Sequence, residues 1–275
     1  MKENAIVKIV PIGNGGGGVY SDLANGKSMS SFLVMVINPD DAEDWYGILL
    51  DAGYLTLDKL MKMGIDLSKI RVIFLSHLHV DHCYDLPLVA HARFRLWASK
   101  NKLMPAGQES PLEPLIIYCP KGYEEIFWDL AKQFGDTEFT KERHPETIFC
   151  PGVQNTEAIS TALVTHADNL QCLAIVLRIA GKVIVYTGDM TNDAANDQVI
   201  AGLAKDPDAL IGEASDSDNR FHRSIEDAIR LFVLCGANIL IVCHVHSGYM
   251  QTVQEVCVGS GGLYVMAEDA VAITI

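Results

Sequence analysis

The sequence predicts one mixed α/β domain with many strands, spanning residues 1–275. Short apolar runs rich in Val and Ile, typical of buried strands, alternate with segments that repeat apolar residues at helical spacing. No Ser/Gly-rich linker, charged run or internal repeat divides the chain. Apolar residues make up 49% of the sequence, enough for a sizeable buried core.

The expected elements follow from these patterns. Strands are expected over residues 5–10, 31–37, 47–53, 71–77, 115–120, 162–167, 172–179, 182–189, 209–215, 239–246 and 264–275. Helices are expected over 56–64, 83–98, 123–135, 193–205 and 224–236. The last begins with a capping-box pattern, Ser224 to Asp227, and Gly236 is a typical stop. The irregular stretch 100–114 is interpreted as a surface connection, with a lid over a site as the alternative.

Charge and cysteine usage narrow the function classes. The formal charge of −14 disfavours a long nucleic acid, whose phosphates are usually neutralised by Lys and Arg. Seven scattered cysteines, odd in number, indicate reduced thiols in a cytoplasm. Cys83 is interpreted as packing beside a site, with a role at a metal as the alternative. We see neither a secretory signal nor an apolar run long enough to cross a membrane.

The stretch LSHLHVDHCYDLP, residues 75–87, contains the pattern H-x-H-x-D-H. The apolar run RVIFLS precedes it, so the ligand-type side chains follow a strand end, where loops build sites. The four residues are His77, His79, Asp81 and His82. Imidazole and carboxylate together suit Zn²⁺ and similar divalent metals. The glycine run from Gly13, by contrast, lacks the Lys-Ser/Thr of a P-loop and is interpreted as a turn, with a glycine-lined edge that lets a ligand approach the backbone as the alternative.

Three further strand ends supply similar groups: His166, Asp189, and His244 or His246. Two histidines of the first motif and His166 offer three nitrogens to one metal. Asp81, His82 and one of the late histidines offer a second set, and the carboxylate of Asp189 is suited to bridge the two.

This order of motifs resembles the metallo-β-lactamase-fold hydrolases. The resemblance implies an αββα four-layer sandwich with two metals at one edge. It implies the following ligand sets: His77, His79 and His166; Asp81, His82 and His244; and Asp189 as the bridge. His244 is preferred because LIVCH looks like the family's LxLTH strand end, and His246 is held in reserve. His79, where the flavodiiron oxygen reductases of this fold commonly have Glu, favours hydrolysis.

A narrower resemblance points to the ribonuclease Z-like branch. Glu213 in IGEAS is similar to that branch's H-E-A-T segment, and His222 in FHRS is similar to its H-S-T stretch. Gly212 and Arg223 depart from those patterns. The segment between His166 and Asp189 has no room for the long basic tRNA-binding arm of many ribonuclease Z proteins. A small phosphodiester, such as a cyclic nucleotide, is therefore the expected substrate.

The expected activity is hydrolysis by hydroxide drawn from a water shared by two divalent metals, Zn²⁺ first and Mn²⁺ or Fe²⁺ as alternatives. Asp81 would accept its proton, His222 would protonate the leaving oxygen, and Glu213 would hold the tautomer of His222. Arg220 and Arg223 would meet a phosphate or form exposed salt bridges. The alternatives are a lactonase, thioesterase or β-lactamase, an RNA-processing ribonuclease Z, and a non-hydrolytic iron dioxygenase or scaffold. The oligomeric state stays open, with a homodimer considered.

Overall fold

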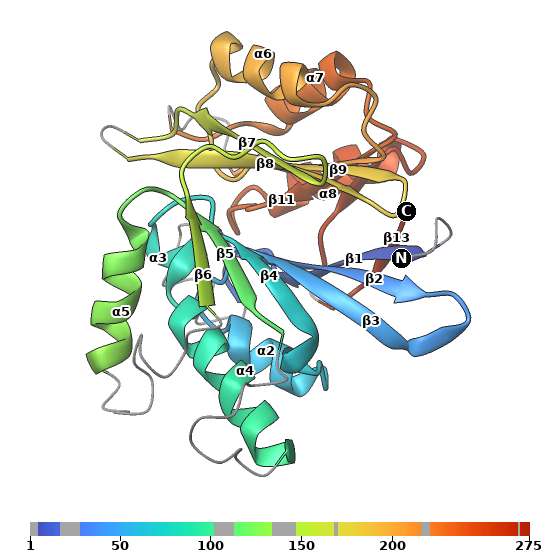
Figure 1. Ribbon diagram of the computed structural model, residues 1–275. Helices are drawn as coiled ribbons and strands as arrows, with labels where there is room; N and C mark the ends of the chain where they lie inside the picture. Colours follow the sequence, from blue (N-terminus) through green and yellow to red (C-terminus); the bar gives the residue numbers. More distant parts are fainter. Residues whose placement is uncertain are drawn as a thin grey trace.

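A computed structural model describes residues 5–16, 28–101, 113–133, 147–167, 170–215, 221–268 and 270–275. Two sheets pack face to face, and helices cover the outer face of each (Figure 1). This is the αββα arrangement that the family resemblance implied. The N- and C-terminal strands β1 and β13 pair with each other at one edge of the first sheet (Figure 1).

The first sheet has the strand order β13-β1-β2-β3-β4-β5-β6. Its strands are β1 (Ile6–Gly13), β2 (Ser31–Asn38), β3 (Asp41–Leu50), β4 (Ile70–Phe74), β5 (Leu115–Cys119), β6 (Thr147–Pro151) and β13 (Ile273–Thr274). The strands from β13 to β3 are antiparallel, whereas β3 to β6 are parallel. The parallel strands therefore end at one common edge.

The second sheet has the order β12-β11-β10-β9-β8-β7. Its strands are β7 (Ile159–Val164), β8 (Cys172–Ile179), β9 (Lys182–Tyr186), β10 (Ala209–Glu213), β11 (Ile239–Cys243) and β12 (Tyr264–Met266). β8 and β9 form a hairpin whose two turn residues, Ala180 and Gly181, both have positive φ, as a tight primed turn requires. The expected two strands and a turn between His166 and Asp189 are thus confirmed.

Helices cover both outer faces (Figure 1). The first sheet carries α2 (Thr56–Lys62), the short 3₁₀ segment η1 (Leu67–Lys69), α3 (Val80–Cys83), α4 (Leu86–Asn101) and α5 (Tyr123–Gln133). The second sheet carries α6 (Ala194–Leu203), α7 (Ile225–Cys235) and α8 (Met250–Gly259). The capping box of Ser224 and Asp227 is present at the start of α7, and Gly236 ends the helix with φ 69°.

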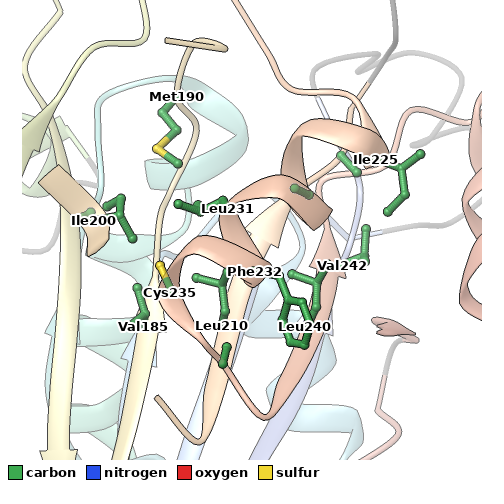
Figure 2. Close-up of a cluster of buried hydrophobic side chains, with 14 of the residues drawn as sticks. Val185, Met190, Ile200, Leu210, Ile225, Leu231, Phe232, Cys235, Leu240 and Val242 are labelled. Carbon is green, nitrogen blue, oxygen red and sulfur yellow. The ribbon is translucent and has the colours of Figure 1, made fainter. Parts of the chain in front are cut away.

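Three apolar layers hold these elements together. One lies between the sheets and includes Phe32, Phe74 and Tyr186. The others lie under the two helical layers. Figure 2 shows the layer under α7, where Leu231 and Phe232 of the helix lie over Leu210 and Leu240 of β10 and β11. Burial of this kind is the main favourable term in folding.

The structure corrects several expected elements. Residues 264–275 do not form one strand: β12 belongs to the second sheet and β13 to the first, because the chain crosses from one to the other in between. Helix α8, strand β6 and the polar first half of β3 were not expected. α8 has β-branched residues and no strong cap, and the start of β3 lacks the apolar pattern of a buried strand.

No helix of the described residues is long and apolar enough to cross a membrane. Residues 102–112 of the expected surface connection and residues 17–20 of the glycine run lie outside the described part of the chain. That residues 1–275 form one domain stays a prediction.

Candidate metal centre

Loops at the ends of four strands carry the ligand-type side chains. β4 leads to His77 and His79, and α3 follows with Asp81 and His82 in its single turn. β7, β9 and β11 lead to the others, which are His166, Asp189 and His244. These strands belong to both sheets, so the cluster lies where the two sheets meet at one edge.

The first group brings three imidazole nitrogens together. His79 Nδ1 lies 3.0 Å from His77 Nε2 and 3.2 Å from His166 Nε2. Nitrogen ligands at 2.0–2.1 Å around a tetrahedral zinc ion lie about 3.3 Å apart, so the spacing suits one ion. The outer nitrogens fix the tautomers: His77 Nδ1 donates to Ser76 Oγ (2.9 Å) and His166 Nδ1 to the Phe221 carbonyl (2.9 Å).

The second group combines Asp81, His82 and His244, all buried. His244 Nε2 lies 3.1 Å from Asp81 Oδ2, and His82 Nε2 lies 3.8 Å from the same oxygen. His244 has φ 54°, a conformation that is costly for a residue other than glycine and that the surrounding structure must hold in place.

Asp189 lies between the two groups. Its Oδ2 is 3.2 Å from His244 Nε2, 3.3 Å from His82 Nε2, 3.9 Å from His77 Nε2 and 4.0 Å from His166 Nε2. One oxygen thus approaches nitrogens of both groups, as a bridging ligand would.

The donor set fits divalent cations. His82 Nε2 and Asp189 Oδ2 are buried and have no hydrogen-bond partner, although buried polar atoms nearly always have one. Both atoms point to the cluster, and His and Asp together are typical ligands of Zn²⁺, Mn²⁺ and Fe²⁺.

Asp51 supports the cluster from behind and was not expected from the sequence. Its Oδ2 accepts hydrogen bonds from His82 Nδ1 (2.7 Å), Ser76 Oγ (2.7 Å) and Tyr186 Oη (2.6 Å), and Oδ1 accepts from the Ser76 amide (2.6 Å). A carboxylate behind a ligating histidine fixes the ring and raises its basicity. The signal in the sequence was a lone Asp after the apolar run GILL, which predicts a strand end but no role.

His222 and Glu213 lie beside the second group. His222 Nδ1 donates to Glu213 Oε2 at 2.8 Å and lies 3.7 Å from Asp189 Oδ2. Glu213 is fully buried, and its Oε1 accepts from the Met190 amide at 2.7 Å. The Nε2 atom of His222 is therefore the nitrogen left for chemistry.

Charges around the cluster set its protonation. Burial lowers the pKa of His222, but its hydrogen bond to Glu213 and that carboxylate's charge outweigh burial and raise the pKa above its ordinary value. Burial and the charge of Asp189 raise the pKa of Glu213. Burial lowers the pKa of His166 to about 4. Burial lowers the pKa of His244, but the charge of Asp189 and the hydrogen bond to Asp81 together outweigh burial and raise the pKa to about 9.

His246 and Cys83 belong to none of the ligand groups. The Nδ1 atom of His246 accepts from the Gly248 amide. Cys83 donates to the Leu78 carbonyl, and burial raises the pKa of its thiol to about 11, so the thiolate is disfavoured.

Two arginines flank His222 in the sequence, Arg220 and Arg223. Arg223 was expected to meet a phosphate or to form an exposed salt bridge, and both expectations are wrong. Its side chain is 1% exposed, because the guanidinium is held between Asp197 of α6, at 2.5 Å, and the Asp227 carbonyl of α7, at 3.4 Å. Arg220 lies outside the described residues.

Gly16 packs closely against one of the candidate metal ligands. A Cβ at Gly16 would lie 3.0 Å from His244 Nδ1, so glycine allows the backbone to approach this ligand. Gly16 therefore borders the metal cluster.

Comparison with known proteins identifies the family. A model of the metallo-beta-lactamase superfamily matches residues 43–244, which include all seven candidate ligands. The chain belongs to the metallo-beta-lactamase superfamily. Within it, the chain is 26% identical to a ribonuclease Z of Pyrobaculum aerophilum over 89% of this chain and 88% of that protein. It is 24% identical to a ribonuclease BN of Escherichia coli over 81% of this chain and 85% of that one.

Among solved structures, the metallo-beta-lactamase fold protein YhfI of Bacillus subtilis superposes with a TM-score of 0.68 at 19% identity. The match covers 98% of this chain and 100% of that one. Membership of the superfamily, the relatives and the His/Asp cluster together make this chain a metal-dependent hydrolase.

Proposed function

We propose that this metallo-beta-lactamase superfamily enzyme hydrolyses small phosphodiesters, with His222 as the general acid. The observation that carries the proposal is the hydrogen bond of 2.8 Å between His222 Nδ1 and Glu213 Oε2, beside the ligand cluster. A lactonase of the same fold also expels an alkoxide, so the substrate panel below separates the two classes.

Two cations are proposed, one held by His77, His79 and His166, and one by Asp81, His82 and His244, with Asp189 shared. Bound Zn²⁺, or Mn²⁺ or Fe²⁺ in its place, would lower the pKa of a coordinated water and polarise the phosphoryl oxygens. All other steps depend on residues of the chain.

Asp81 would accept the proton of the attacking water. Burial raises the pKa of Asp81, but in the metal-free protein the charge of His82 and the hydrogen bond and charge of His244 outweigh burial and hold the pKa well below its ordinary value, so the carboxylate is ionised before a cation binds. An ionised carboxylate at this position orients the water by accepting its hydrogen bond.

His222 would complete the reaction by donating a proton. The water oxygen bonds to phosphorus, the bond from phosphorus to the ester oxygen breaks, and the Nε2 proton passes to that oxygen, leaving a phosphomonoester and an alcohol. Glu213 keeps the other proton on Nδ1, so that Nε2 is the donating atom. The hydrogen bond to Glu213 and the charge of that carboxylate raise the pKa of His222, which favours the protonated form that donates.

The net charge of −14 supports a small substrate, because a long nucleic acid would be repelled without a local basic surface. The cysteines of the described chain form no disulfide, which supports a reducing cytoplasmic location.

A second candidate is RNA processing, since two relatives are named ribonuclease Z and ribonuclease BN. The test is a panel of substrates on metal-loaded protein: cyclic nucleotides and bis-p-nitrophenyl phosphate, a tRNA precursor, a lactone and a thioester. Preference for the small phosphodiesters by kcat/KM is expected. A higher kcat/KM for the lactone or thioester contradicts the proposal, and a higher value for the tRNA precursor supports the second candidate.

A further inference from the structure

The buried side chain of Arg223 connects the segment of His222 to two other parts of the molecule. Its Nη2 donates to Asp197 Oδ1 in the first turn of α6 (2.5 Å) and to the Thr191 carbonyl (3.3 Å), two residues after Asp189. The backbone is held as well, since the Ser215 amide donates to the Arg223 carbonyl at 2.9 Å. His222 and Arg223 are neighbours, so anchoring one restricts the other.

Asn196, one residue before Asp197, connects the other two loops. Its Nδ2 donates to the Thr165 carbonyl (2.9 Å) and the Thr191 carbonyl (3.2 Å), and its Oδ1 accepts from the Thr165 amide (2.9 Å). Thr165 precedes His166, and Thr191 follows Asp189 by two residues. Asn196 is 3% exposed and these bonds use its donors and its acceptor inside the protein.

We propose that the first turn of α6 positions three active-site loops, with Asn196 setting the loops of His166 and Asp189, and Asp197 setting His222 through Arg223. The part concerning His222 rests on its proposed role as general acid. None of the three side chains belongs to a ligand group, so each is a positioning residue.

The two connections predict different defects. Loss of the Asp197–Arg223 pair frees the segment of His222, and displacement of about 1 Å is enough to cost a large factor in rate. Loss of Asn196 frees a ligand of the first group and the shared ligand, which weakens cation binding, because partners behind ligands typically change metal affinity 10–100-fold.

The first experiment compares Arg223→Met with Arg230→Met. Arg230 also pairs with Asp197, at 3.2 Å, but it lies within α7 and is half-exposed, and it is not a sequence neighbour of His222. Arg223→Met should lower kcat about tenfold or more on a methyl phosphodiester and much less on a p-nitrophenyl one, with metal content unchanged. Arg230→Met should leave the ratio of the two rates as in the wild type.

Two further variants keep the test informative if Arg223→Met fails to fold. Arg223→Lys keeps the charge but loses the forked donors that reach Asp197 and Thr191 together. Asp197→Leu with Arg223→Met replaces the buried pair by apolar side chains, a change that is often tolerated. Both should show the same selective loss on the methyl ester.

The second experiment compares Asn196→Leu with Asn155→Leu, an exposed asparagine that accepts a hydrogen bond from Ser160 Oγ. Zn²⁺ affinity, measured by competition with a chromogenic chelator, should fall about tenfold or more for Asn196→Leu and stay unchanged for Asn155→Leu. Equal Zn²⁺ affinities for the two variants would overturn the role of Asn196.

The results separate the two proposals. If His222→Ala shows no dependence on the leaving group, the proposed general acid fails. If His222→Ala shows it and Arg223→Met and Arg223→Lys do not, the positioning role fails. A crystal structure of the Arg223 variant that retains the bond between His222 Nδ1 and Glu213 Oε2 at 2.8 Å would overturn the positioning role in either case.

Discussion

At the scale of single residues, the pair of His222 and Glu213 distinguishes this site from a bare metal cluster. The sequence indicated both residues through short motifs, and the structure places them in direct contact. Asp51 escaped prediction because its role comes from contacts with Ser76, His82 and Tyr186, which are distant in sequence and meet only after folding. The expectations for Arg223 were wrong because the residues next to it in the sequence do not indicate that its partner is Asp197 on α6.

His222→Ala should retain metals and fold. It should lower kcat by roughly 10²-fold or more on an ester with a poor alkyl leaving group, because the alkoxide would then leave without the proton that His222 supplies. The loss on a p-nitrophenyl ester should be much smaller, since p-nitrophenolate leaves without a proton. Steady-state kinetics on both esters is the measurement, and equal losses would assign His222 to binding.

Glu213→Gln should move the alkaline limb of the pH–rate profile to lower pH. The hydrogen bond and charge of Glu213 raise the pKa of His222 against the effect of burial. A general acid acts in its protonated form, so activity is lost as pH rises through the pKa of His222. Glu213→Gln removes the negative charge and therefore lowers that pKa. Profiles of kcat for wild type and variant on an alkyl ester test this, and an unmoved limb would exclude His222 as the titrating group.

At the scale of elements, strand ends were the most predictable feature. The apolar runs RVIFLS and ILIVC predict buried strands, and the ligand-type residues that follow these runs lie at the metal cluster. α8 was not predicted because its residues, MQTVQEVCVG, include β-branched side chains and lack a capping residue, so that tertiary packing decides its conformation.

Asp51 links the end of β3 to α3 and β9, so Asp51→Ala should loosen the second ligand group. It removes the acceptor of His82 Nδ1 and leaves Tyr186 Oη buried without this partner. Zn²⁺ affinity should fall 10–100-fold, as is typical for such partners. Chelator competition measures it, with Asp58→Ala on the exposed side of α2 as the control. Unchanged affinity would show that the loop positions His82 without the carboxylate.

Leu231→Ala on α7 tests the packing shown in Figure 2. Leu231 is 1% exposed, and its truncation should lower the free energy of unfolding by about 2–5 kcal/mol. Val233 on the same helix is 68% exposed, and Val233→Ala should change it by less than about 0.5 kcal/mol. Denaturant titration of both variants gives the comparison, and similar values would mean that α7 is packed loosely.

At the scale of the whole molecule, the cluster joins the two halves. β4 belongs to the first sheet, whereas β7, β9 and β11 belong to the second, so cations bound at their ends would connect the sheets. A ligand that binds the folded state alone stabilises it by mass action. Loading with Zn²⁺ should therefore raise the Tm of the protein. Removal of the metal by a chelator should lower the Tm at which both sheets unfold, and not that of one sheet alone.

The same ligands determine how loading depends on pH. In the metal-free protein, the charge of Asp189 and the hydrogen bond to Asp81 together outweigh burial and raise the pKa of His244 to about 9. The charges of Asp189, Asp51 and Asp81 outweigh burial at His82 and raise its pKa well above its ordinary value. These shifts favour the protonated form of both rings, and each ring must lose a proton to bind a cation, so Zn²⁺ affinity should increase from pH 6 to pH 8. His77 and His166, whose pKa values burial lowers, are already neutral in this range and add little to the pH dependence of Zn²⁺ affinity.

Elemental analysis should give two equivalents of metal per chain at pH 8. His244→Ala should lose the second equivalent, whereas His246→Ala should keep both. One equivalent in the wild type would contradict a shared Asp189, because a carboxylate between two ligand groups has that function only when both groups hold a cation.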